Sequence, residues 1–157
     1  MMALDARVCC NCIRQGATPP HPFPELLAFD ETAEPILKSN GEISLDQWLK
    51  HDAWYRNSCP HAGRLIEKRL GNIALVGHVR DVLESIGATA FPVLGRRVVY
   101  DDTHGGDWIV ASDSVRLLGE AQRLRQLSND SISRQFASDL IELAVASAAT
   151  GNPIVFG

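Results

Sequence analysis

The chain has 157 residues, of which 45% are hydrophobic and 22% are charged, the balance of a folded protein rather than a disordered one. Its 19 acidic and 15 basic residues give a formal net charge of -4 and form no basic block, which argues against nucleic acid as a partner because phosphate binding needs clustered Lys and Arg. The length predicts one globular domain, residues 1–157, able to bury a sizeable core without a metal.

The start of the chain lacks the pattern of a secretory signal, because Asp5 and Arg7 interrupt the opening apolar run. No apolar stretch has the length of a membrane span, so we expect no membrane partner. These features indicate a cytoplasmic protein, in which thiols stay reduced. A disulfide is therefore the least favoured state of the four cysteines.

Residues 3–12 alternate between apolar and polar side chains, which predicts a half-buried strand. One parity consists of Leu4, Ala6, Val8, Cys10 and Cys12. The thiols of Cys10 and Cys12 would therefore share a face, whereas Cys9 would lie on the opposite face with Asp5 and Arg7.

Cys59 and His61 repeat the one-residue gap of Cys10 and Cys12. Three thiolates and an imidazole are a ligand set that closes a tetrahedron around zinc, so Cys10, Cys12, Cys59 and His61 form the predicted metal site. The signal is not decisive, because structural zinc ligands usually come in pairs separated by two to four residues. Buried free thiols are the alternative, since unpaired cysteine packs as a small hydrophobe.

The next segment, residues 16–24, holds four prolines and predicts an extended loop in which His21 is solvated. A short strand follows at residues 26–29, and then a polar connection at residues 32–41. Ser44 and Gln47 have the spacing of a capping box and predict a helix over residues 45–57. His51 and Asp52 on this helix are candidate acid/base residues, although adjacent helical residues do not face each other.

Pro60 ends this helix and leaves Cys59 at its carboxyl end. The negative end of the helix dipole would raise the pKa of Cys59, which argues against a catalytic thiolate there. A bound metal could still deprotonate this thiol, because the cation would dominate the local field.

The second half of the chain predicts a strand at residues 64–70, a helix from residue 73 to Gly87, and two strands at residues 90–94 and 96–100. The loop from Asp101 to Asp107 is very polar, and its His104 and Asp107 could bind a cation or a substrate. A plain hairpin turn explains the same residues.

A further strand at residues 108–111 precedes a helix capped by Ser112 or Asp113. The last helix begins near Ser131, and the apolar residues 154–156 are expected to dock on the body of the protein. This order of elements predicts an α+β fold, with a mostly antiparallel sheet and about four helices packed on one face.

The strand leading into Cys10-Asn11-Cys12, the Pro-rich loop, Cys59-Pro60-His61 and the closing residues 150–154 together resemble a group of small uncharacterised bacterial proteins. These begin with a Leu-Asp strand running into Cys-x-Cys. The resemblance implies a bacterial cytoplasmic protein and favours Cys10 and Cys12 over Cys9 as the meaningful pair. It implies no established activity.

The first functional hypothesis is a zinc-containing binding module whose partner is another protein. The alternative is a metal-free interaction protein with an acidic surface, such as the immunity partner of a bacterial toxin. Ranked below both is an enzyme, either a zinc hydrolase or a thiol enzyme using Cys9, because four-ligand sites are usually structural. The sequence sets neither the partner nor the oligomeric state.

Overall fold

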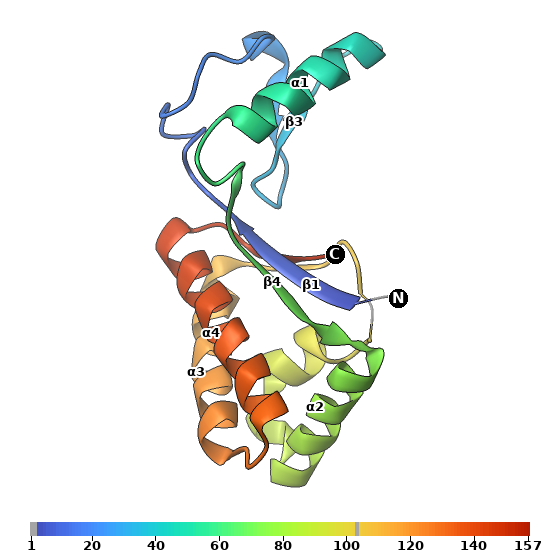
Figure 1. The fold of residues 1–157 in the computed structure, drawn as a ribbon, viewed down its shortest axis with the longest axis vertical. Coiled ribbons are helices and arrows are strands. Elements are labelled where there is room, and N and C mark those ends of the chain that lie inside the picture. Colours follow the sequence, from blue (N-terminus) through green and yellow to red (C-terminus); the bar gives the residue numbers. More distant parts are fainter. Residues whose placement is uncertain (1–2, 103) are drawn as a thin grey trace. The chain divides into compact units, whose positions relative to one another are not determined.

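The computed structural model describes residues 3–102 and 104–157 and shows the expected α+β fold (Figure 1). The strands are β1 (Ala3–Cys9), β2 (Leu27–Phe29), β3 (Pro35–Leu37), β4 (Arg64–Asn72), β5 (Trp108–Ile109) and β6 (Ile154–Phe156). The α-helices are α1 (Leu45–Asn57), α2 (Ile73–Ile86), α3 (Ala111–Leu127) and α4 (Ser131–Thr150). Short 3-10 turns occur at Pro24–Leu26 and Ala88–Ala90, and a π-helical turn at Leu94–Val98.

The chain divides into two compact units. The first unit combines the residues up to Val8 with Ile66–Gly157, and the second consists of Cys9–Leu65. The first unit contains most of β1 and β4 together with α2, α3 and α4. The second contains α1 and the β2-β3 hairpin, in which Leu27 lies opposite Leu37.

The sheet of the first unit is antiparallel, and its strands are ordered β4-β1-β6-β5. Val8 on β1 and Ile109 on β5 both lie opposite Ile154 on β6. The apolar tail therefore docks as expected, and it forms an inner strand of the sheet. Because β6 lies between β1 and β5, the last strand of the chain pairs with both the first strand and β5.

The helices α2, α3 and α4 cover one face of this sheet (Figure 1). Leu4, Ala6 and Val8 are buried toward them, as the alternation predicted. The core cluster is confined to the first unit and includes Leu70, Val76, Val79, Phe91, Leu117, Leu124, Phe136, Leu140 and Ile154. Ser114 and Ser147 join α3 to α4 inside this core through a hydrogen bond of 2.9 Å.

The start of the chain differs from the prediction in one respect. The strand ends at Cys9, and Cys10-Asn11-Cys12 turns away instead of continuing it. Cys9, at the end of the strand, is 1% exposed, whereas Asp5 and Arg7 are half-buried. The strand pairing stops before Cys10, and alternation along the sequence does not mark that end.

The two strands predicted at residues 90–94 and 96–100 are absent from this described stretch. The chain instead forms helical turns, in which Leu94 and Val98 are buried at a helical spacing. The Glu120 carboxylate accepts the N–H of Val93 at 2.9 Å and holds the segment against α3. Packing thus overrides the preference of the β-branched residues for strands.

Two smaller features also differ from the predictions made from the sequence. The connection at residues 32–41 contains β3, which was not predicted. Helix α3 begins after Val110, so neither Ser112 nor Asp113 is its N-cap. The predicted starts of α1 and α4 are confirmed. Ser44 and Gln47 form the capping box of α1, and the N-cap of α4 is Asp130, whose side chain accepts the N–H of Ser133.

Gly71, at the junction of β4 and α2, offers a test of this packing. Its φ is +154°, and a Cβ there would lie 2.7 Å from Leu75 Cδ2. We expect Gly71→Ala to lower the free energy of unfolding by about 1–3 kcal/mol, measured by urea denaturation. The matched control is Gly77→Ala within α2, where a Cβ meets no atom within 4 Å. It should raise stability by about 0.5–1 kcal/mol.

Candidate metal centre

The two arms of the predicted site come from two turns of the second unit. Cys10 and Cys12 lie in the turn that follows β1, and Cys59 and His61 lie in the turn between α1 and β4. Backbone hydrogen bonds from Gln15 to Asn11 and from Ala17 to Cys12 shape the first turn. Thus the structure brings together all four residues that the sequence singled out.

The four side chains lie close enough together to be ligands of one ion. Their ligand atoms all lie within 4.8 Å of one another. Cys10 Sγ is 3.6 Å from Cys59 Sγ, and Cys12 Sγ is 3.4 Å from His61 Nδ1. Ideal tetrahedral zinc, with Zn–S near 2.3 Å and Zn–N near 2.0 Å, separates two sulfurs by about 3.8 Å and a sulfur from a nitrogen by about 3.6 Å. The cluster is therefore close enough to hold a metal.

Backbone amides bind the sulfurs in the same way in both arms. The sulfur of Cys10 accepts from the N–H of Cys12, and that of Cys59 accepts from the N–H of His61. Gly63 adds a third such contact, with its N–H 3.5 Å from Cys59 Sγ. These amides stabilise negative charge on sulfur, which is the form that binds a metal.

The pKa values of the two neighbouring thiols, Cys10 and Cys59, shift in opposite directions. Burial, together with the side chains of Cys59 and Cys12, outweighs the amide of Cys12 and raises the pKa of Cys10 to about 12. Burial also opposes ionisation of Cys59, but the amides of Gly63 and His61 outweigh it and lower its pKa to about 6. The expectation that the helix end raises the pKa of Cys59 is wrong, because direct N–H contacts to the sulfur outweigh the helix dipole.

Gly63 also joins the two arms. Its carbonyl accepts the N–H of Cys10 at 3.1 Å, while its own N–H reaches Cys59. Its φ is +82°, and a Cβ would collide with the ring and hydroxyl of Tyr55, which leaves no room for any side chain. Glycine is thus required at this position by both backbone angle and space.

The prediction for one histidine near α1 was wrong. His21 is buried rather than solvated, and its Nε2 lies 2.9 Å from Nδ1 of buried His51. The N–H of Phe23 donates to His21 Nδ1 at 2.8 Å, and His51 Nε2 reaches the carbonyl of Pro35 at 3.2 Å. Trp54 donates to the carbonyl of Pro19, so the Pro-rich loop is fixed to α1 at two points.

The remaining candidates do not join the cysteine cluster. Asp52 is exposed and pairs with Arg56 at 2.8 Å, so it does not face His51, as helical geometry predicted. In the first unit, Nε2 of His104 lies 2.7 Å from the carbonyl of Val98. Its Nδ1 is 3.5 Å from the carboxylate of Asp107, which also binds the hydroxyl of Tyr100.

Comparison with known protein families, curated proteins and solved structures found no match to this chain. In the described residues, no helix combines the length and apolar character needed to cross a membrane. The function of this chain is therefore inferred from its own residues and their geometry.

The contrast between Cys59 and Cys10 predicts the order of their reaction with an alkylating reagent. In chelator-treated protein at pH 7, we expect iodoacetamide to modify Cys59 before Cys10, since a thiolate reacts and a thiol does not. Timed quenching and peptide mass spectrometry measure the order. Equal rates, or faster modification of Cys10, would contradict the assignment of the negative charge to Cys59.

Proposed function

We propose that this chain is a zinc-containing protein-binding module, in which Cys10, Cys12, Cys59 and His61 hold one structural zinc ion. The single observation that carries the proposal is the clustering of three sulfurs and one imidazole nitrogen within 4.8 Å of one another. All four protein ligands are present, which is the arrangement of a structural site rather than of one with an open position for chemistry.

The small core of the second unit supports a structural role for the metal. Within residues 9–65, the hydrophobic side chains that are almost completely buried are Cys9, Ala33 and Leu37. Units of this size gain little stability from so few buried side chains and commonly depend on a metal or a disulfide. Zinc would hold together the two turns on which the rest of the unit depends.

The magnitudes favour metal binding as well. Closing the loop of roughly 46 residues between Cys12 and Cys59 costs on the order of 3 kcal/mol plus a constant in chain entropy. Structural zinc contributes about 10 kcal/mol or more to peptides that fold around it. Zinc would also end the opposite pKa shifts of Cys10 and Cys59, because both sulfurs are deprotonated when they bind the ion.

Helix α1 supplies the surface that such a module would present. Trp48 and Leu49 lie three and four residues after Leu45, and the three side chains Leu45, Trp48 and Leu49 are 73%, 45% and 60% exposed. Neighbouring large apolar side chains on one helix face are typical of a protein-binding surface. This face leads along α1 to Cys59, so zinc would fix the carboxyl end of the helix that carries it.

Elemental analysis tests the metal. We expect one zinc per chain in protein purified without chelator, and loss of that zinc in Cys10→Ser, Cys59→Ser and His61→Ala. Cys9→Ala is the matched control and should keep the metal, because Cys9 is not among the four clustered ligands. A parent protein with no metal would overturn the proposal and favour the metal-free interaction protein.

Affinity capture tests the binding surface. The zinc-loaded chain should retain a stoichiometric protein from a lysate of the organism that encodes it, and Leu45→Ser/Leu49→Ser should lose that protein while keeping its zinc. Leu127→Ser is the control, because Leu127 is 50% exposed on α3. Equal capture by the double variant would show that α1 is not the binding surface.

A further inference from the structure

Among the described residues, no strand lies beside one edge of β4. It is the terminal strand in the order β4-β1-β6-β5, so β1 pairs with only one of its edges. The nine residues of β4 make it the longest strand of this sheet. A long outer edge offers backbone donors and acceptors to a further strand unless other features block it.

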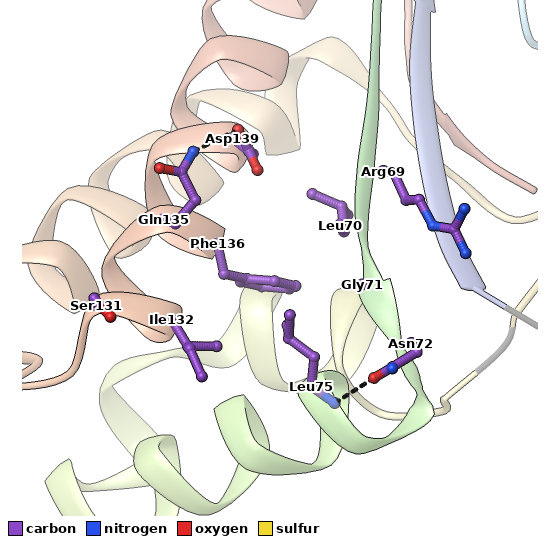
Figure 2. A pocket seen from close by; sticks show the side chains of 10 residues that line it. All are labelled: Arg69, Leu70, Gly71, Asn72, Leu75, Ser131, Ile132, Gln135, Phe136 and Asp139. Carbon is purple, nitrogen blue, oxygen red and sulfur yellow. Dashed lines mark hydrogen bonds between the residues drawn. The ribbon is translucent and has the colours of Figure 1, made fainter.

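A groove runs beside the carboxyl half of this edge. Figure 2 shows Leu70 and Phe136 between β4 and α4, whereas Arg69 projects to the other side of β4, where β1 lies. The volume of the groove is about 630 Å³, and its floor is formed by Leu70, Leu75 and Phe136. Leu70 and Phe136 are almost completely buried, so an added strand beside β4 could place an apolar side chain on an existing core surface.

The side chains of β4 alternate between two faces. Ile66 and Leu70 pack against the core, and Lys68 between them forms ion pairs with Asp139 and Glu142 of α4. Glu67 and Arg69 are exposed and therefore belong to the opposite face of the sheet. One face of the strand is therefore apolar except for Lys68, whose charge is balanced by α4. The other face carries one negative charge on Glu67 and one positive charge on Arg69.

We propose that the second strand is β4 of another copy of this chain, paired antiparallel about a two-fold axis at Lys68. In this register Glu67 lies opposite Arg69 of the other copy, and Ile66 lies opposite its Leu70. Each pair occurs twice because the interface is symmetric. Opposite charges and apolar side chains directly across an antiparallel pair stabilise it.

The sequence of β4 is what favours a second copy over a segment of an unrelated protein. An ideal partner for residues 66–70 reads apolar, acidic, any residue, basic, apolar in the antiparallel direction. Ile66-Glu67-Lys68-Arg69-Leu70 has this pattern itself. The charge complementarity is therefore built into the strand, and no other occupant has to be assumed.

The central lysine does not prevent this pairing. Two Lys68 side chains face each other at the axis and would repel if they were unpaired. Each lysine, however, is held by Asp139 and Glu142 of its own α4, and the pKa of Lys68 is raised first by its hydrogen bond with Glu142. The register also places α4 of both copies on the same side of the joined sheet, so Ile66 of one copy points toward the groove beside Leu70 of the other.

Sedimentation equilibrium of the full zinc-loaded chain tests the proposal by charge reversal. We expect the parent protein at twice the chain mass of 17.2 kDa. Glu67→Arg and Arg69→Glu should each halve the mass, because either change places like charges opposite each other at both symmetric positions. The combined variant Glu67→Arg/Arg69→Glu should restore the dimer, since it exchanges the two charges without changing the pattern.

Glu84→Arg on α2 is the matched control for Glu67→Arg, because it makes the same change in net charge away from β4 and should leave the dimer intact. Circular dichroism of each variant verifies that a loss of mass is not a loss of fold. A parent chain that stays monomeric over the accessible concentration range would overturn the proposal and leave the edge to a strand of another protein. A dimer that both single reversals leave intact would also overturn it.

Discussion

The second unit depends on one constraint, the contact between the turn after β1 and the turn before β4. Gly63, in the turn before β4, takes part in it through both of its backbone groups. Its carbonyl accepts a hydrogen bond from Cys10 in the other turn, and its N–H donates one to Cys59 in its own turn. The backbone therefore places the two arms before any metal is considered. A site arranged by main-chain bonds can bind an ion with little further ordering, which is the physical meaning of preorganisation.

The electrostatics of the cysteine cluster also favour the binding of a cation. Without a metal, one negative charge is concentrated on Cys59, and the thiol of Cys10 is close enough to share a proton with it. Such a pair is a compromise, because the two sulfurs would both be thiolates at the same time only with a nearby cation. The conflict is local to the second unit and leaves the hydrophobic core of the first unit untouched.

Much of this arrangement could be predicted from local sequence signals. The capping box at Ser44, the Asn72 and Asp130 caps and the periodicity of α2 and α4 are short-range features, and the helices begin where these signals lie. The ligand set could be predicted because cysteine and histidine are rare and were grouped in two short motifs. Their meeting in space was a hypothesis that only the fold could test.

The errors arose where contacts distant in sequence decide the conformation. Nothing near residue 93 in the sequence indicates that Glu120 accepts its amide, so the apolar run looked like strand. His21 seemed solvated in its Pro-rich loop because its partner, His51, lies 30 residues away. Cys59 was assigned a raised pKa because the helix dipole is visible in the sequence, whereas the amides of His61 and Gly63 act only through the turn geometry.

The chain of hydrogen bonds through His21 and His51 has a fixed direction. Since Phe23 donates to Nδ1 of His21, the proton of that ring is on Nε2, and the proton of His51 must then be on its own Nε2, facing Pro35. A second proton on either ring would replace an acceptor with a donor and set two N–H groups against each other. Burial, and then the nearby His51, lower the pKa of His21, so the loop is fastened to α1 by imidazoles that hold it only while both are uncharged.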